Sequence, residues 1–465
     1  MSLAQRSPRV GKVQRASCAA VGAGAEALAR GETAEAAANP LALVLADREL
    51  WLIYGNIVLY AVCFNLQAPV MPALTQSFGS TPEGFGTLMS LFALVQLVGG
   101  LMCGPLMDVN GPKWGFMVSY LSGAAAYGMQ AFATSMPLLY LSRLPMAAQH
   151  AALAARIAVS AKATSTGAQA ALLGYISLAY SVGAVVGPVL GGALASHSLR
   201  IVSLVAAGLS VLSAASIALG MPASCCTNRR VAQQPHPTSP VAEHGVPPPP
   251  PPPPPPAARH SKLSLADFRR VATLQGVPSL LATKGVMSLV LALFHGVFAL
   301  AASTHFGLSP AATGAVLSAM SVITMVTQAF VIDWAVARFP PRRVFAVNAA
   351  AMAASLVGLA ASTHMSAVML FLIPLSVSSC VLSTLNTAQL NAAAGAGDRG
   401  SMNAIDMSVS SGVRVFSPAL GTWMLARAGF GSIGATGALL MAGLLITVEA
   451  GARRAEAGRR VDALH

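Results

Sequence analysis

Twelve long apolar stretches, each 20 to 25 residues in length, dominate this chain and constrain its fold more than any other feature. A membrane-spanning α-helix needs about 20 consecutive apolar residues, because the hydrocarbon core of a bilayer is about 30 Å thick. The stretches therefore predict an all-α integral membrane protein with twelve transmembrane helices. They cover residues 51–73, 85–106, 114–134, 137–158, 171–195, 200–220, 281–302, 311–333, 344–363, 366–388, 403–426 and 431–450.

The composition agrees with a membrane protein. Of 465 residues, 55% are apolar and only 9% are charged, whereas soluble domains carry roughly 25% charged residues. Polar surface is too scarce to cover a water-soluble globule, so lipid must cover much of the chain. The net charge of +13 would suggest nucleic acid in a soluble protein. Here the excess of Lys and Arg in cytoplasmic loops explains it, and we expect a lipid bilayer and no nucleic acid as partner.

Charge and composition divide the chain into five regions. Most of the 28 Lys and Arg residues lie on one side if the N-terminal tail is cytosolic, which predicts that both termini are cytosolic. The regions are an N-terminal tail (1–50), a first six-helix half (51–220), a linker (221–280), a second six-helix half (281–450) and a C-terminal tail (451–465).

Two of these regions leave alternatives open. The linker contains ten consecutive prolines, 247–256, which form a stiff polyproline helix that acts as a spacer or as a ligand for a Pro-binding domain. The N-terminal tail is basic and rich in Ser and Ala, so it is either a cytosolic tail or an organelle transit segment. The protein therefore belongs in the plasma membrane or in an organelle membrane.

An internal repeat relates the two halves. Residues of the same type recur at a nearly constant offset, as expected for two copies of one unit. Gly86 pairs with Gly314, Pro145 with Pro374 and Pro188 with Pro418, at separations of 228, 229 and 230 residues. Two pseudo-symmetric six-helix halves, with substrate bound between them near the membrane midplane, form the major facilitator fold.

The loop after the second stretch contains Gly104, Asp108, Gly111 and Lys113. These positions resemble the loop signature of the major facilitator superfamily, although Val and Pro occupy two of its basic positions. Glycine permits the tight turn. The carboxylate of Asp108 could face the N-terminus of a neighbouring helix and hold a gate closed. The alternative is a plain turn with a capping Asp.

The fifth stretch resembles the signature of drug:proton antiporters in the same superfamily. Small residues let helix backbones approach closely, and a proline frees a carbonyl and bends the helix. Such a contact suits helices that rock, although ordinary membrane packing also uses small residues. The signature residues are Gly174, Gly183, Gly187, Pro188, Gly191 and Gly192.

From about residue 55 to residue 450, the chain resembles the tetracycline-transporter-like branch of drug:proton antiporters. Within it, the likeness is to the organic-cation-transporter-like multidrug proteins of solute carrier family 22. The resemblance implies proton-coupled export or exchange of lipophilic, often cationic small molecules by alternating access, and we expect a monomer. It is carried by Gln96-Leu-Val-Gly-Gly, Ser142-Arg143-Leu-Pro145, Met325-Val-Thr-Gln328 and Arg414-x3-Pro418-x2-Gly421.

Ionisable residues inside the stretches are candidates for substrate binding or proton coupling, because charge in hydrocarbon is costly. We select Arg143, His150, His295, Asp406 and Arg414 as candidates; Lys284 is a further basic residue within a stretch. His150 follows Arg143 by seven residues, so a continuous helix would put both on one face, about 10 Å apart. Histidine titrates near neutral pH and suits a proton carrier. Structural roles stay open for each residue, including Asp406 as a helix cap.

Neutral polar side chains in the stretches could bind substrate or join helices. They are Asn56, Asn65, Gln67, Gln96, Gln328 and Asn386. Drug:proton exchangers of this type usually carry an acidic residue in the first span, but the first six stretches here contain no carboxylate. Either His150 and Asp406 carry the coupling, or the protein does not exchange protons. Arg143 and Arg414 also permit an anionic or neutral substrate.

Two other functions stay open beside the antiporter. One is a uniporter or symporter for a metabolite, and the other is a non-transporting membrane scaffold or receptor that uses the polyproline linker to bind partners. The chain has no nucleophile–base spacing, no metal-ligand cluster and no phosphate-binding glycine loop. We therefore expect neither an enzyme nor a metal or cofactor site.

Overall fold

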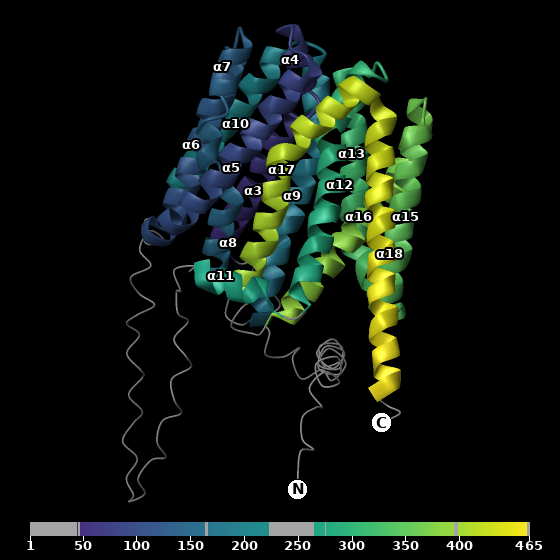
Figure 1. The fold of residues 1–465 in the computed structure, drawn as a ribbon. Coiled ribbons are helices and arrows are strands. Elements are labelled where there is room, and N and C mark those ends of the chain that lie inside the picture. The colour runs from purple at the N-terminus through teal and green to yellow at the C-terminus, as the bar shows by residue number, and fades with distance from the viewer. Residues whose placement is uncertain are drawn as a thin grey trace, which may run out of the picture.

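The computed structural model describes residues 44, 47–162, 166–222, 265–274, 276–394 and 399–462, and within these the chain is helical and has no strands (Figure 1). The polyproline run, and with it the predicted spacer or Pro-binding ligand, lies outside the described residues. So does the predicted transit segment.

Helices of the first half occupy residues 48–220. They are α3 (Arg48–Leu66), α4 (Met71–Ser77), α5 (Pro82–Asn110), α6 (Pro112–Ala131), α7 (Met136–Leu141), the short 3-10 helix η1 (Pro145–Ala148), α8 (Ala151–Lys162), α9 (Thr166–Ala195) and α10 (Leu199–Gly220).

The remaining helices begin within the predicted linker, where α11 lies, and continue through the second half. They are α11 (Leu265–Ala272), α12 (Val277–Thr304), α13 (Pro310–Val326), the π-helical turn η4 (Thr327–Val331), α14 (Ile332–Arg338), α15 (Pro341–Ala361), α16 (Met365–Ala393), α17 (Arg399–Ala428) and α18 (Phe430–Asp462).

Each of the twelve predicted stretches overlaps at least one of these helices. In the part of the chain that the structure describes, nine helical segments are long and apolar enough to cross a membrane. The other three stretches are those of α6, of α7 with α8, and of α17. The multi-pass all-α membrane fold is confirmed, and the count of twelve crossings stays a prediction.

The internal repeat extends to backbone geometry. Gly79 and Gly307 both have a positive φ, 69° and 65°, in the turn before α5 and α13, a conformation that glycine adopts without strain. Two residues later, the hydroxyl oxygens of Thr81 and Ser309 accept hydrogen bonds from the first turn of these helices. The two halves therefore begin their second spans in the same way.

The fourth stretch is not one continuous helix. α7 ends at Leu141, η1 begins at Pro145, and α8 begins at Ala151. Arg143 lies in the turn between α7 and η1, and His150 lies just before α8. The prediction that seven helical residues place Arg143 and His150 on one face is therefore wrong. Pro145 lacks an amide donor and helps to end the helix here.

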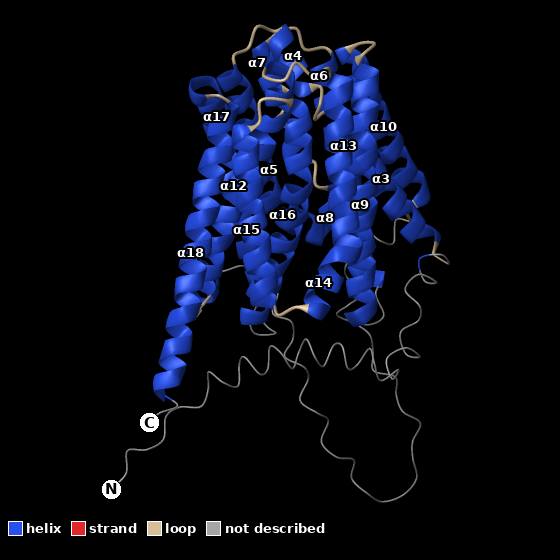
Figure 2. Ribbon diagram, turned by 90° about the vertical axis from the view of Figure 1, so that its right-hand side faces the viewer, coloured by secondary structure: helices blue, strands red, loops and turns tan. Residues whose placement is uncertain are grey.

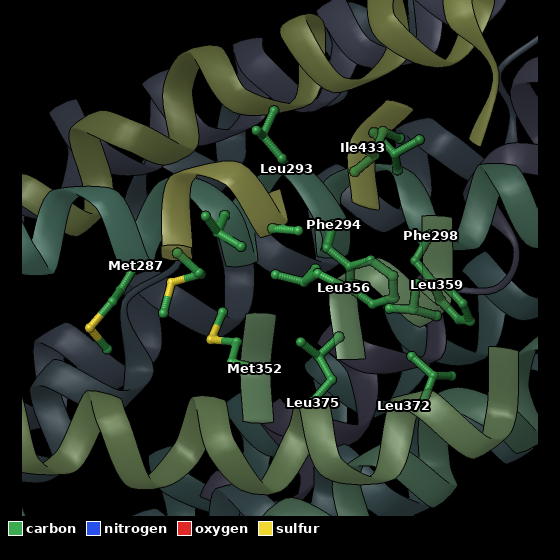
Figure 3. Packing of buried hydrophobic residues seen from close by; sticks show 14 of the residues in the cluster. Met287, Leu293, Phe294, Phe298, Met352, Leu356, Leu359, Leu372, Leu375 and Ile433 are labelled. Atoms are coloured by element: carbon green, nitrogen blue, oxygen red, sulfur yellow. The ribbon is translucent and has the colours of Figure 1, made fainter. Parts of the chain in front are cut away.

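Each half has its own apolar core. In the second half, Phe294 and Phe298 of α12 pack with Leu356 of α15, Leu375 of α16 and neighbouring side chains (Figure 3). Close packing of such side chains stabilises contacts between helices in lipid. The two largest apolar clusters of the first half are built from its own helices.

The halves meet through two helix pairs, α9 with α13 and α5 with α17. Figure 2 shows α3, α9 and α13 running side by side. These pairs are related by the repeat. The backbone of Gly314 lies against Pro188, and that of Gly86 lies against Pro418.

The two ends of the bundle differ. We name them the α4 end and the α11 end, after the short helices that lie there (Figure 1). At the α4 end, Leu300 of the second half is buried with Met71, Leu74, Phe85 and other residues of the first half, and Gln76 donates a hydrogen bond of 3.2 Å to Ser303. At the α11 end, no apolar cluster of the described residues joins the halves. The structure is thus closed between the halves at the α4 end.

Candidate functional site

A buried ion pair joins α12 to α17. The ammonium of Lys284 lies 3.0 Å from Asp406 Oδ1 and 3.2 Å from Oδ2, and the hydroxyl of Thr387 on α16 donates to Asp406 Oδ2 at 3.1 Å. Both charged side chains are about one-tenth exposed. Asp406 is the eighth residue of α17, so its role is to pair with Lys284 rather than to cap the helix.

Further polar residues continue this contact along the two helices. Ser288 and Ser410 lie 3.4 Å apart through their hydroxyl oxygens, one turn beyond the ion pair. Helical spacing puts residues three, four and seven apart on one face, which also brings His295 of α12 and Arg414 of α17 to this side. We call the six residues Lys284, Ser288, His295, Asp406, Ser410 and Arg414 the α12–α17 seam.

Arg414 is exposed. Its neighbours on the same face of α17 show which part of the molecule this side chain is directed toward. One turn to either side on the same face, Ser410 contacts α12 and Pro418 contacts Gly86 of the first half. On the opposite face, Phe416 and Trp423 are exposed by half, as expected for side chains in lipid. Arg414 therefore lies on the face of α17 that turns toward α12 and the first half, away from the lipid-facing side.

The groups around Arg414 come from both halves. Its guanidinium interacts electrostatically with His295 of α12 and with Tyr180 of α9. The side chain of Asn65 on α3 interacts with the Tyr180 hydroxyl. We call Arg414, His295, Tyr180 and Asn65 the central site.

Aromatic rings extend the central site into the first half. Tyr60 lies 6.4 Å from Tyr180 and 6.5 Å from Phe64, and Phe64 lies 5.9 Å from Phe92, between ring centroids. All four rings are partly exposed. We call them the aromatic wall. They offer an apolar surface to the body of a small molecule.

Arg143 lies elsewhere, inside the first half. It is 4% exposed, and its guanidinium contacts Gln130 Oε1 at 3.2 Å and the sulfur atoms of Met71 and Met146. Gln130 in turn donates to Gln67 and to Ser203. The described contacts of Arg143 include no carboxylate. The described side-chain contacts of Arg143 and Gln67 are with residues of the first half, whereas Arg414 lies on α17 of the second half.

His150 packs against the glycine-rich middle of α5. A Cβ added at Gly100 would lie 3.3 Å from His150 Cε1, so a larger residue there would require the ring to shift by a few tenths of an ångström. The Nε2 atom has no hydrogen-bond partner within the described ranges. Gln96 lies nearby on α5 and donates to the carbonyl of Met146 at 3.0 Å. His150 and Gln96 thus form a second polar group, in the first half.

The remaining neutral candidates divide by their contacts. Asn56 is buried and joins α3 to α10, because its Oδ1 accepts from Ser216 at 3.0 Å. Gln328 is exposed on the π-helical turn η4, a feature frequently found at functional sites. Asn386 is fully buried, and neither of its polar atoms has a partner among the described residues.

Only some residues of the loop signature make side-chain contacts in this structure. The backbone of Gly111 has a φ of 83° and ends α5. The ammonium of Lys113 donates to the carbonyls of Ala218 and Met221 at the end of α10, where a cation complements the helix dipole. Asp108 is exposed and has no hydrogen bond or ion pair within the described residues. Its predicted latch is not formed here.

The glycines of the fifth stretch have distinct roles. Gly183 and Gly187 face α3, where an added Cβ would lie 2.6 Å from Val58 O and 2.9 Å from Val62 O. Gly192 faces the other half, and its Cβ would lie 2.6 Å from Pro310 O. Gly174 has no atom within 4 Å of such a Cβ. α9 thus fits between α3 and α13 because, at most of the signature glycines, a side chain would collide with a neighbouring backbone.

Sequence reasoning missed two parts of the site. It noted Lys284 only as a basic residue in a span, although a Lys and an Asp within the spans of one half can pair in lipid. It did not single out Tyr180 or the aromatic wall, because aromatic residues are common in membrane helices and no motif marks these four.

The sequence of this chain is similar to several known transporters. Human solute carrier family 67 member A1 is 29% identical over 77% of this chain and 82% of its own length. Solute carrier family 22 member 18 of Mus musculus is 26% identical over 80% of this chain and 87% of its own length. The class G tetracycline resistance protein of Vibrio anguillarum is 32% identical over 30% of this chain and 36% of its own length.

Solved structures share the fold. A peptide transporter in complex with alafosfalin superposes with a TM-score of 0.67 at 13% identity, over 86% of this chain and 94% of that one. The human organic anion transporter MFSD10 superposes with a TM-score of 0.59 at 17% identity, over 85% and 98%. The sequence profile of the Major Facilitator Superfamily matches residues 53–295, just over half of the chain. The chain therefore belongs to the Major Facilitator Superfamily.

Proposed function

We propose that this protein is a secondary active transporter that moves amphiphilic small molecules by alternating access and couples this movement to protons. The observation that carries the proposal is the central site, where Arg414 and His295 of one half face Tyr180 and Asn65 of the other. A site shared between two rocking halves is exposed to each side of the membrane in turn.

Glycine contacts support the rocking motion. The paired contacts of α9 with α13 and of α5 with α17 bring backbones close together at glycines such as Gly314 and Gly86. In this proposal the α4 end opens while the α11 end closes, and Asp108 then meets the N-terminus of a helix from the other half. That contact would stabilise the closed α11 end electrostatically.

The Lys284–Asp406 pair supports proton coupling. Protonation of Asp406 removes its charge and leaves the ammonium of Lys284 without a counter-ion in a buried place. A buried charge without a partner is strongly unfavourable, so Lys284 must then move toward water or substrate. Proton binding is thereby linked to rearrangement of α12 against α17. His150 is the second candidate for the coupling group.

The class of substrate is the point at which the resemblance and the geometry diverge. The resemblance predicts lipophilic cations, which a carboxylate in the site would favour. The central site offers Arg414 instead, and Asp406 is engaged by Lys284. A metabolite uniporter or symporter and a non-transporting scaffold are the alternatives to proton-coupled exchange.

Reconstitution separates these functions. The purified protein is placed in liposomes with a pH gradient, and uptake of lipophilic cations, neutral compounds and anions is followed together with the internal pH. We expect pH-driven uptake that Asp406→Asn abolishes, while substrate exchange without a gradient continues. If His150→Ala rather than Asp406→Asn has this effect, the coupling group is His150. No movement of any compound, with or without a gradient, would reject a transporter.

A further inference from the structure

We infer that the central site binds an organic anion, whose carboxylate, sulfonate or phosphate group contacts Arg414 and whose apolar body lies on the aromatic wall. The inference rests on the transport function proposed above and specifies its substrate class. It replaces the cation that the family resemblance implies.

The first argument is charge balance. The carboxylate of the seam is Asp406, which is already paired with Lys284 and lies eight residues from Arg414, about 12 Å along the helix. The first six stretches contain no carboxylate at all. Arg414 has no hydrogen bond or ion pair within the described residues. The central site therefore carries an uncompensated positive charge, which attracts an anion and repels a cation.

The second argument is the chemistry of the donors. A guanidinium presents a planar set of N–H groups that matches a carboxylate or phosphate in two parallel hydrogen bonds. The hydroxyl of Tyr180 and the ring of His295 lie within the electrostatic reach of Arg414 and can donate further hydrogen bonds to the same anionic group. The side chain of Asn65 lies near the Tyr180 hydroxyl, and its amide donates to the Ala61 carbonyl at 2.8 Å.

The third argument is the apolar surface beside these donors. Tyr180 belongs both to the central site and to the aromatic wall, so a polar head on Arg414 places the rest of a molecule against Tyr60, Phe64 and Phe92. Aromatic rings alone could also hold a cation. The unpaired Arg414 next to Tyr180 makes this second use unfavourable, and the combination favours an amphiphilic anion.

A matched series of probes tests the sign of the charge. The full-length protein in detergent is titrated with 1-naphthylacetate, 1-naphthylacetamide and 1-naphthylmethylammonium, which share one aromatic body and differ in head group. Binding is measured as thermal stabilisation and by calorimetry, neither of which requires transport. We expect the anion to bind at least about tenfold more tightly than the amide, which corresponds to at least about 1.4 kcal/mol, and the ammonium to bind least.

Variants then assign the anion to Arg414. Arg414→Gln should weaken binding of 1-naphthylacetate at least about tenfold, and Arg414→Lys should retain part of it. Arg427→Gln is the matched control, since it removes the same charge from an exposed position of the same helix. Tight binding of the ammonium, no binding of the anion to the wild type, or anion binding that survives Arg414→Gln would overturn the inference.

These outcomes are distinct from those of the transport experiment. Anion binding without any pH-driven uptake would support the site and reject the coupled transport. Uptake that favours the ammonium would support the transport and reject the anion site.

Discussion

The two halves of this protein hold a buried cation in different ways. In the second half, Lys284 is paired with the carboxylate of Asp406. In the first half, Arg143 is surrounded by an amide oxygen and two thioether sulfurs. A counter-ion left alone in a buried place is costly, whereas neutral dipoles lose little when the cation is removed. Among the described residues, only the second half carries a buried charge pair that a proton can switch, because the ion cluster of the first half is about one-quarter exposed.

The largest effect is expected for the ion pair of the second half. Asp406→Asn should lower the free energy of unfolding by about 3–5 kcal/mol, because Lys284 is left buried without a counter-ion. The double variant Lys284→Met/Asp406→Leu should recover most of this loss. Denaturant unfolding in mixed micelles measures both, with Asp108→Asn as a control at an exposed carboxylate. Equal losses in the single and double variants would show that the pair does not act as a unit.

A smaller difference is expected at two glycines that the repeat relates. A Cβ at Gly191 would collide with the backbone carbonyl of Leu66, whereas a Cβ at Gly421 would meet the Val297 side chain at 2.5 Å. Backbone yields less easily than a methyl group, so Gly191→Ala should cost about 1–3 kcal/mol and Gly421→Ala less. Thermal unfolding of the two variants compares them. Gly174→Ala, where no atom lies within 4 Å, is the control.

Removal of the cation in the first half should have little effect on stability. Arg143→Met replaces a buried charge that has no carboxylate partner, so we expect a change in the free energy of unfolding within about 1 kcal/mol, in either direction. The same unfolding assay compares it with Lys284→Met. A loss from Arg143→Met as large as that from Lys284→Met would contradict the contrast between the halves.

The smallest effect belongs to an ion cluster at the border of the first half. Lys162 at the end of α8 lies 2.6 Å from Asp47 and 2.5 Å from Glu49 at the start of α3. Each side chain is about one-quarter exposed, so Lys162→Gln should cost about 0.2–1 kcal/mol. High salt should reduce this cost, and a salt-independent loss would argue against an electrostatic origin.

The same cluster predicts a pH dependence. Burial alone would raise the pKa of Asp47, but hydrogen bonds from Lys162 and from the Glu49 amide outweigh it and lower that pKa. Burial alone would lower the pKa of Lys162, but Asp47 and Glu49 raise it. The stabilisation is therefore complete between about pH 3.9 and pH 10.4, the unfolded values. It fades as pH falls through the lowered Asp47 pKa or rises through the raised Lys162 pKa. Lys162→Gln should remove this dependence.

Sequence alone determined the class of this protein. Long apolar stretches form helices in lipid, because a helix makes all of its backbone hydrogen bonds within one segment and needs no water to complete them. The constant offset between Gly86 and Gly314 predicted two related halves, and the matching turns at Gly79 and Gly307 have the same backbone conformation. The membership of the superfamily followed from these features and is confirmed.

Tertiary structure decided what the polar residues do. Pro105, Pro188, Pro374 and Pro418 lie inside continuous helices, whereas the helix breaks at Pro145, and nothing local to the sequence separates these cases. Neighbouring helices and side chains decide whether the freed carbonyl is satisfied. Likewise, Lys284 meets Asp406 across 122 residues, and Arg414 faces Tyr180 across the two halves. Helical periodicity gives the face of each helix, but only packing decides which faces meet.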